Sequence, residues 1–446
     1  MSRQEQTFLH ISKKTNAAYV GEIKQGVTGE QPATPLAKDE GGGKVAKWFD
    51  PGNDYPDKII KDINAVPTLS ATLYWKANAL ISGGLVYGEV NYDDDGNEKL
   101  KPIKDPEIEA FLQTSNYRRF LRKMSTEFYK FWNVFPTLIF DENLSKVAGF
   151  KCNESAWCRW GLQDKNDGVI KDCYINTNWQ ENNEDSPSTI HMPVINPYFR
   201  SVESVKERKD GNQFIYPVSG ESSGQAYYEL APWDSIRQSK WLDVVKMIPE
   251  FKYQLMKNQM TVRYIIKMPD WWMEWKYKGE WENFEPEKRR TLVEAEYDKF
   301  DTFLSGVENS GKSIAFMMKT TSDGKLYEGW TIEEVPNSMQ FDAAYNEDSE
   351  IGTSYIFNAL GVHASLVATS PGKSSMNSKG SEIRNLFNMH IANCKPEQDI
   401  LLEPFHFIRD FNGWNPNIQF WFRNYFLTTL DQTSTKDRNF NAGEQA

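Results

Sequence analysis

Two segments with helical periodicity enclose a polar segment in the C-terminal quarter of the chain. Between positions 341 and 361, apolar side chains recur at spacings of three and four, at Ala344, Tyr345, Ile351, Tyr355, Ile356 and Ala359. This spacing predicts an amphipathic helix, and Gly361 is the residue type expected after its last turn. The spacing resumes after the polar segment, at Ile383, Leu386, Phe387, His390, Ile391, Cys394, Ile400, Leu401, Phe405 and Ile408. We therefore expect a helix, a loop and a longer helix, with kinks or breaks at Pro396 and Pro404.

The segment from His363 to Gly380 is too polar to be buried and too long for an ordinary connection between helices. A few cations among several hydrogen-bond donors suit a loop that touches the phosphate backbone of DNA. The residues concerned are Lys373, Ser374, Ser375, Asn377, Ser378 and Lys379. One copy would bind DNA weakly, whereas a ring would present many weak contacts at one radius. The alternative interpretation is a mobile surface loop.

The first half of the chain reads as helices followed by strands. Helical patterns run from Asp57 to Ile81, interrupted by Pro67, and from Pro106 to Phe131. A strand is expected between them. From Val134 to Trp233, short apolar runs separated by Asp, Asn, Gly, Ser and Pro predict strands with long loops. The chain is therefore expected to be of the α+β class.

A second α/β group follows an amphipathic pattern at 234–260, in which Asp234 or Ser235 is a candidate cap and Pro249 is expected to bend or divide the helix. This group comprises a helix at 287–304 and strands at 261–267, 314–318 and 330–335. Within it, four tryptophans lie among charged residues, at Trp271, Trp272, Trp275 and Trp281. We expect another subunit to cover these rings, because a monomer that exposed them all would associate. The alternative is burial within the chain.

This order of elements, from about Ala77 to Leu430, resembles the portal proteins of tailed double-stranded DNA bacteriophages. The helix that ends in Leu360-Gly361-Val362, the small polar loop and the helix with a proline near its middle carry the resemblance. It implies a portal-like α+β fold with a helical stem, an α/β clip insert, a mixed α/β wing with a β-rich part, a tunnel loop and a long C-terminal helix. The implied boundaries are a flexible N-terminal arm at 1–55, the wing at 56–233, stem helices at 234–260 and 336–361, the clip at 261–335, the tunnel loop at 362–380, the long wing helix at 381–410, and a small crown-side segment with a tail at 411–446.

The resemblance implies a function as well as a fold. Portals form a ring of about twelve subunits at one capsid vertex. They conduct DNA during packaging and ejection, and they contact the major capsid protein, the large terminase subunit and a head–tail adaptor. The expected location is therefore the virion, with assembly in the host cytoplasm. The chain departs from the family in having only about 35 residues after Asn412, where portals usually carry a large crown.

One motif supports a different class of protein. Residues 306–313 match the phosphate-loop pattern of nucleotide-binding enzymes. Such a loop needs a strand before it and a helix after it, because the helix N-terminus holds the phosphates. Here the helix is expected first and the strand second, and Glu308 would repel phosphate. A P-loop ATPase and a virion structural protein that forms no ring are the rival hypotheses.

The remaining features indicate neither a metal site nor an enzyme. Cys152, Cys158, Cys173 and His191 lack the close ligand pairs that make zinc signatures specific, so ordinary buried thiols are favoured. No cofactor, catalytic residue or membrane span is expected. The formal net charge of −11, from 51 basic and 62 acidic residues, disfavours tight binding of phosphates over a broad surface.

Overall fold

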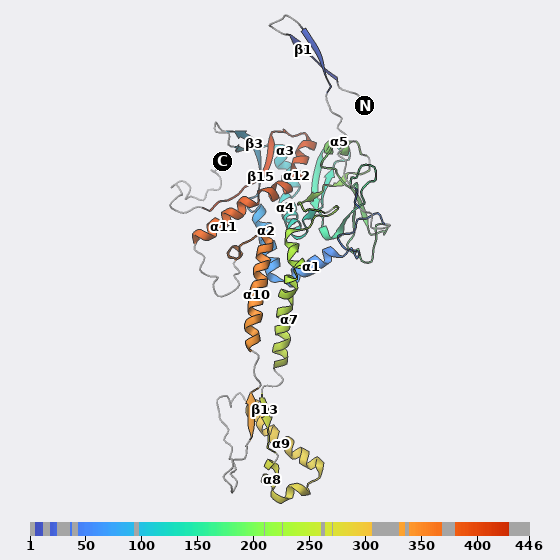
Figure 1. Cartoon of the computed structure of the whole chain (residues 1–446). Coiled ribbons are helices and arrows are strands. Elements are labelled where there is room, and N and C mark those ends of the chain that lie inside the picture. Colours follow the sequence, from blue (N-terminus) through green and yellow to red (C-terminus); the bar gives the residue numbers. More distant parts are fainter. Residues whose placement is uncertain are drawn as a thin grey trace. The chain divides into compact units, whose positions relative to one another are not determined.

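The structure is a computed structural model. It describes residues 5–11, 18–24, 36–37, 43–92, 98–208, 210–224, 226–259, 264–269, 271–305, 330–334, 339–367 and 380–427. The chain divides into two compact units, the first made of Met1–Asp243 with Glu350–Ala446 and the second of Val244–Ser349. Helices and small antiparallel sheets alternate along the described chain (Figure 1), which confirms the α+β fold class.

The helices of the first unit begin with two pairs. Pro67 opens the second helix of the first pair and fits there because the first turn of a helix needs no proline N–H. The segment predicted as one helix from Pro106 to Phe131 is two helices, and that prediction is wrong at Asn116, which takes a left-handed conformation with φ of 53°. The four helices are α1 (Tyr55–Ala65), α2 (Pro67–Ile81), α3 (Pro106–Thr114) and α4 (Tyr117–Phe131).

The strands of the first unit pair antiparallel in small sheets. In one sheet, β3 (Leu85–Tyr92) lies between β4 (Glu98–Pro102) and β15 (Ile418–Phe422), so the C-terminal part of the chain returns to its first strand. The β-rich segment forms two further three-stranded sheets and a strand pair. These are β11 (Gln213–Ile215), β6 (Pro136–Phe140) and β7 (Val147–Cys152); β10 (Ile190–Pro193), β9 (Asp172–Ile175) and β8 (Cys158–Trp160); and β5 (Asn133–Val134) with β12 (Val218–Ser219).

A single aromatic core joins the helices to these sheets. Phe120 of α4 lies 4.2 Å from Phe150 of β7, measured between ring centroids, and Phe150 lies 5.7 Å from Phe405. Phe405 in turn lies 5.7 Å from Phe420 of β15. Burial of such rings contributes about 1.5–3 kcal/mol each, so this chain of contacts holds α4, β7 and β15 around the helix that carries Phe405.

The long C-terminal helix is divided near its first proline. α11 (Gly380–Asn393) ends before Cys394, and α12 (Lys395–Asn412) begins with Pro396 in its first turn and continues through Pro404. Pro396 thus marks a break, as expected, whereas Pro404 lies inside a continuous helix. Leu401, Phe405 and Ile408 on α12 are fully buried, so this helix belongs to the core of the first unit.

Two parts of the segment 1–55, which is predicted as a flexible arm, have defined structure. Backbone pairing of Glu5–Ile11 with Ala18–Lys24 makes the hairpin β1–β2. Further on, Trp48 is fully buried and its ring stacks on that of Tyr228 at 4.4 Å. The burial of Trp48 could not be predicted from the polar composition of this segment, because a single buried tryptophan leaves no periodic pattern.

The second unit contains the group that follows the helix predicted at 234–260. The described elements are α7 (Trp241–Gln259, which starts in the first unit), β13 (Tyr264–Lys267), α8 (Trp271–Tyr277), α9 (Pro286–Ser305), β14 (Thr331–Glu334) and α10 (Met339–Leu360, which ends in the first unit). β13 and β14 pair antiparallel, with Tyr264 opposite Glu334. α7 begins later than predicted, because Lys240 is left-handed with φ of 68°, and it is continuous through Pro249.

Candidate subunit interface and helix anchors

The predicted DNA-facing residues lie outside the described residues. These are Lys373, Ser374, Ser375, Asn377, Ser378 and Lys379. The chain is described up to Val367 and again from Gly380. α10 ends at Leu360, and Gly361 follows with φ of 63°, a left-handed conformation that glycine adopts without strain. The stop signal read from the sequence is therefore confirmed.

The end of α10 is held by a lysine from a distant helix. The ammonium of Lys76 on α2 donates a hydrogen bond of 2.9 Å to the carbonyl oxygen of Leu360. A cation at this position also complements the negative end of the helix dipole. The same ammonium lies 4.0 Å from a carboxylate oxygen of Glu397 and 4.7 Å from the ring centroid of Tyr129, whose hydroxyl donates to Glu397. Lys76 thus joins α10, α4 and the first turn of α12.

A histidine next to this lysine is buried. His390 is 8 % exposed, its ring lies 4.8 Å from that of Trp75, and its Nε2 lies 3.6 Å from the sulfur of Cys394. Burial, and then the positive charge of Lys76, lowers the pKa of His390 to about 4. His390 is therefore neutral at physiological pH and packs as a core side chain, as its place on the apolar face predicted.

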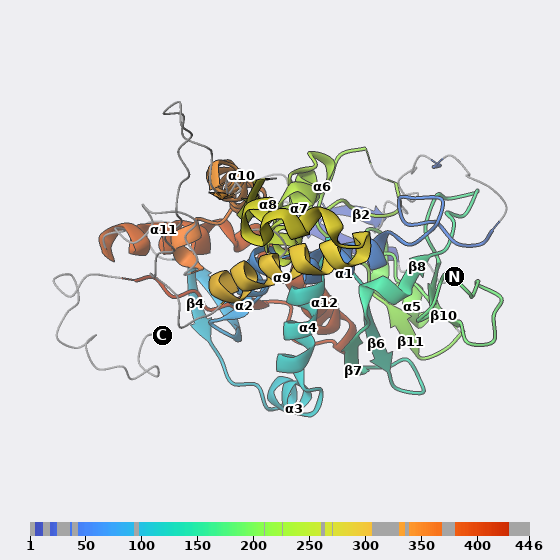
Figure 2. The same ribbon diagram turned by 90° about the horizontal axis from the view of Figure 1, so that it is seen from below.

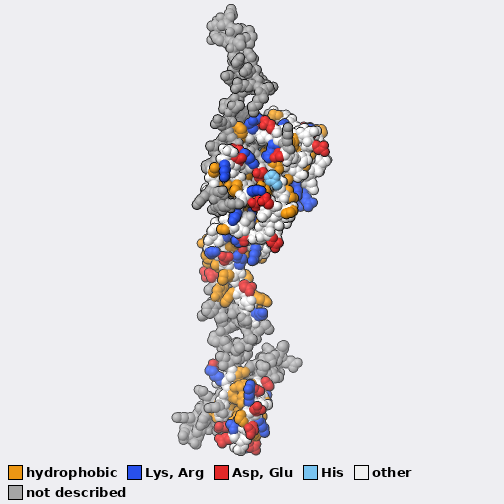
Figure 3. Space-filling model, turned by 90° about the vertical axis from the view of Figure 1, so that its right-hand side faces the viewer, with side chains coloured by type: hydrophobic (Ala, Val, Ile, Leu, Met, Phe, Trp, Pro, Cys, Tyr) orange, Lys and Arg blue, Asp and Glu red, His pale blue; other side chains and the backbone are white. Residues whose placement is uncertain are grey.

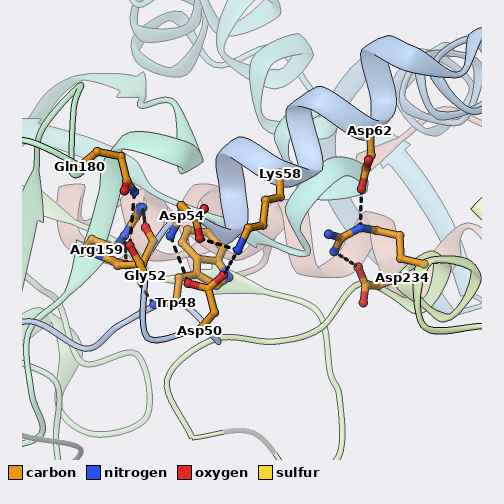
Figure 4. A network of polar contacts seen from close by, with 11 residues as sticks. Trp48, Asp50, Gly52, Asp54, Lys58, Asp62, Arg159, Gln180 and Asp234 are labelled. Carbon is orange, nitrogen blue, oxygen red and sulfur yellow. Dashed lines mark hydrogen bonds and ion pairs between the residues drawn. The ribbon is translucent and has the colours of Figure 1, made fainter. Parts of the chain in front are cut away.

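The start of α7 is anchored by an ion-pair network. Arg237, on α6 (Ser235–Gln238), bonds the carboxylates of Asp62 on α1 and of Asp234, both at 2.7 Å (Figure 4). Asp234 is fully buried and also accepts a hydrogen bond of 3.0 Å from the hydroxyl of Tyr55. Burial of Tyr55 beside this carboxylate raises the pKa of its phenol. Asp234, one of the two predicted caps, stands at the N-cap position of α6, but its carboxylate bonds these groups and makes no capping hydrogen bond.

A buried arginine joins the N-terminal segment to the β-rich part. Arg159, labelled in Figure 4, is fully buried. Its guanidinium donates to the carbonyl oxygens of Ala156 at 2.7 Å and of Asn53 at 2.9 Å. Its Nε donates to the side-chain oxygen of Asn53 at 2.6 Å, and the guanidinium lies 5.5 Å from the ring centroid of Trp48. Because neutral oxygens and a ring replace water around this cation, burial lowers its pKa. Removing any of these partners would leave the buried guanidinium of Arg159 with an unsatisfied hydrogen bond or without its aromatic neighbour.

In the second unit, α7 exposes apolar side chains on more than one side. Ile248 is buried and Phe251 lies 4.9 Å from Tyr345 of α10, so these positions mark the side that faces α10. Met247 and Met256 are 68 % and 70 % exposed, and nine positions of helical rotation place them on opposite flanks. Tyr253, which is 60 % exposed, lies on the side turned away from α10. A helix with apolar residues on both flanks is suited to contact one neighbour on each side.

Three of the four predicted tryptophans are in ring contact with one another, and the fourth contacts a neighbouring tyrosine. Trp271, Trp272 and Trp275 are on α8, where the rings of Trp272 and Trp275 are 5.2 Å apart, and Trp281 stacks with Tyr277 at 6.1 Å. Trp275 is 45 % exposed and the other three are half-buried. The second unit presents hydrophobic side chains bordered by charged ones in Figure 3. Packing within the chain therefore covers these rings in part, and their contact with another subunit stays a prediction.

The phosphate-loop pattern at 306–313 and the strand expected at 314–318 lie outside the described residues. α9 ends at Ser305, directly before the pattern, so a helix stands where a P-loop requires a strand. Cys158 and Cys173 are buried free thiols, and Cys152 is half-buried. Among the described residues, no group of three or more His, Cys, Asp and Glu side chains could hold a metal ion. No helix in the described part of the chain has the length and apolarity to cross a membrane.

Comparison with solved structures finds the same fold in particle necks, although no protein-family model and no curated protein matches the chain. A chain of the virion of a native gene transfer agent particle shares 12 % identity with a TM-score of 0.56, over 85 % of this chain and 86 % of that one. A chain of the neck of the empty particle, computed with C6 symmetry, has 13 % identity and a TM-score of 0.56 over 86 % and 87 %. A chain of the native neck, computed with C12 symmetry, has 13 % identity and a TM-score of 0.54 over 85 % and 86 %.

Proposed function

We propose that the chain is a structural component of a phage-like virion and that it forms the portal ring in the neck of that particle. The observation that carries the proposal is the shared fold, which extends over 85 % or more of this chain and of chains from gene transfer agent particles. Coverage of this extent means that the likeness includes both compact units of the chain. The symmetry of the neck reconstructions, C6 and C12, belongs to those particles and motivates a ring of about twelve subunits here.

The exposed side chains of α7 support a ring over a monomer. Met247 and Met256 lie on opposite flanks and are among the most exposed apolar residues of the described chain. A ring places a neighbour on each side of every subunit, so both flanks would be covered at once, whereas a two-fold dimer would cover one. Acidic and basic side chains are interspersed over the face of the first unit shown in Figure 3, which suits a protein that DNA passes without being held.

The proposal assigns roles to the parts of the chain. α7 and α10 would be the stem helices, β13, α8, α9 and β14 the clip, and the segment between α10 and α11 the tunnel loop that faces double-stranded DNA with Lys373 and Lys379. The clip, with Trp271, Trp272, Trp275 and Trp281, would contact neighbouring subunits, the large terminase subunit and later the head–tail adaptor. The first unit would contact the major capsid protein. The chain itself would hydrolyse nothing.

Contacts with the first unit at the start of α7 and at the end of α10 are consistent with a role as stem helices. The short helix α6, which directly precedes α7, is bound to α1 through Arg237 and Asp62, and the end of α10 is bound to α2 through Lys76 and Leu360. Both anchors lie within the first unit, so the two helices leave it from fixed points. A conduit that must bear the passage of DNA needs its stem helices held in this way.

Native mass spectrometry and particle images of the purified chain test the proposal. We expect a closed ring of about twelve copies with a central channel. A protein that stays monomeric over micromolar to high micromolar concentrations, or that forms only open filaments, would contradict it. Thermal unfolding with and without ATP in the same preparations distinguishes the ATPase alternative, which requires stabilisation by nucleotide.

A further inference from the structure

An apolar groove is open on the surface of the first unit. It lies between α1, α2 and α4 and has a volume of about 190 Å³. Its lining is Ile63, Asn64, Ser70, Leu73, Tyr74, Thr126 and Lys130. Ile63 and Leu73 are buried, while Tyr74 is 60 % exposed and stands at its edge. A cavity of roughly 150 Å³ accepts one benzene ring, so the groove has the size for one aromatic side chain.

A second apolar feature projects from another part of the same unit. It consists of Met389 on α11 and of Tyr425, Phe426 and Leu427, which begin three positions after the end of β15, and we name it the apolar knob. Their exposed fractions are 63 %, 50 %, 57 % and 44 %. The side chain of Asn388 accepts a hydrogen bond of 2.9 Å from the backbone N–H of Leu427 and donates one of 3.1 Å to its carbonyl oxygen. The knob is thus fixed against α11, and four adjacent exposed apolar residues are typical of a contact site.

The knob and the groove are formed by different elements of the unit. α11 lies on the left in both Figure 1 and Figure 2, and α1 lies to the right of α2 in both views. α2 contacts α11 through the rings of Trp75 and His390, which are 4.8 Å apart. The groove is open in this structure, so the knob of the same chain does not fill it. Two different apolar surfaces of one molecule that do not contact each other can meet between copies in a head-to-tail arrangement, which closes into a ring when the rotation between copies allows it.

We infer that the apolar knob of each copy inserts into the α1/α2/α4 groove of the next copy around the ring, with the Phe426 ring as the inserted group. This inference rests on the proposed ring and identifies one of its contacts. The groove favours an aromatic ring because its apolar wall at Ile63 and Leu73 faces such a ring, and the ammonium of Lys130 can lie over the face of that ring. The fixed backbone at Leu427 reduces the entropy lost when the knob binds.

Cross-linking between two introduced cysteines tests the contact. Ser70→Cys places a thiol in the groove and Phe426→Cys places one on the knob. In the double variant, oxidation is expected to give a ladder of covalent oligomers on a non-reducing gel, while each single variant gives none above the parent. The four native cysteines contribute little background, because three are buried and Cys152 is half-buried. Ser70→Cys with Tyr198→Cys is the matched control, since Tyr198 is 87 % exposed and lies in the β-rich segment.

The outcomes separate this inference from the proposed function. A ring in particle images whose double variant cross-links no better than the control pair overturns the knob-in-groove contact and leaves the ring. Dimers from Phe426→Cys alone also overturn it, because they indicate a symmetric contact between knobs. A ladder without a closed ring supports the contact and contradicts the portal proposal, and neither ladder nor ring contradicts both. Independently, Phe426→Ala is expected to raise the protein concentration for half-assembly about tenfold, and Tyr198→Ala to leave it unchanged.

Discussion

The ammonium group of Lys76 lies 2.9 Å from the carbonyl oxygen of Leu360, the last residue of α10. The two residues are 284 positions apart in the chain, and the lysine side chain is 14 % exposed. Because the last carbonyls of a helix have no partner within it, this lysine satisfies one of them and also neutralises part of the helix dipole.

Replacing this lysine by an apolar residue of similar length is expected to destabilise the first unit. In Lys76→Met, the Leu360 carbonyl loses its donor and Glu397 loses its nearest cation, which costs about 1–3 kcal/mol of unfolding free energy. Urea unfolding at fixed protein concentration measures the change, and amide hydrogen exchange should rise in the last turn of α10. Lys146→Met removes an exposed ion pair with Glu107 and serves as the control, with an expected change within about 0.5 kcal/mol. Equal effects of the two substitutions would contradict the role of Lys76.

The sequence predicts those features of the fold that depend on interactions between residues near one another in the chain. Local signals succeeded for α9 and α10, because apolar spacing, an opening proline and a closing glycine act within a few residues. Left-handed residues were missed at Asn116 and Lys240. Lysine rarely takes that conformation, and asparagine is enriched in it but more often takes others, so neither residue type alone marks the position in the sequence. Asn116 separates α3 from α4 and Lys240 separates α6 from α7, whereas the apolar periodicity predicted one helix in each case.

The buried contacts of three residues could not be predicted from the sequence either. Arg159, Lys76 and Trp48 act through partners far away in the chain, and nothing in their neighbourhoods distinguishes them from ordinary surface residues. The Trp-rich segment was recognisable because its four tryptophans are close in sequence. The knob and the groove are built from four helices and the segment after β15, so no local sequence pattern predicts them.

Trp48 provides the second prediction. It is fully buried, and its ring lies 4.4 Å from Tyr228 and 6.1 Å from Phe135. Trp48→Ala leaves a large cavity and is expected to cost about 3–5 kcal/mol, as measured by urea unfolding. Trp48→Phe should cost much less, because it keeps a ring against Tyr228 and removes an indole N–H that has no hydrogen-bond partner. If Trp48→Ala were as stable as the parent, residues 43–49 would be detached in solution.

The third prediction concerns pH and His390. Its pKa falls from an unfolded value of 6.5 to about 4 in the folded chain, mainly through burial. The unfolded chain therefore binds the extra proton first as pH falls, so this contribution to stability is complete above pH 6.5 and is lost between pH 6.5 and 4. The loss amounts to at most about 3 kcal/mol. Unfolding free energies at pH 7.5 and pH 4.5 should differ less in His390→Gln than in the parent, and an unchanged difference would show that His390 is not buried neutral.

The fourth prediction addresses the flanks of α7. Met247→Glu and Met256→Glu each place a carboxylate in the proposed interface, where burial of an unpaired charge is costly. Each is expected to shift the population from rings to monomers in native mass spectrometry, with circular dichroism unchanged because both side chains are exposed in the monomer. Tyr198→Glu, at an equally exposed position of the first unit, should leave the rings intact. Full ring formation by both methionine variants would exclude α7 from the interface.

The last prediction concerns the segment between α10 and α11. If Lys373 and Lys379 contact DNA phosphates in the channel, Lys373→Ala with Lys379→Ala removes two cations per copy, which sum to about 24 charges around a ring of about twelve. Rings should form normally, while the amount of nuclease-protected DNA in particles assembled with the variant falls below that of the parent. This difference should shrink at higher salt, because salt already weakens the contacts between these cations and phosphate. Lys146→Ala, which removes an exposed cation from the β-rich segment, is the control and should package as the parent does. Loss of the rings themselves in the double variant would instead make these lysines part of the assembly contacts.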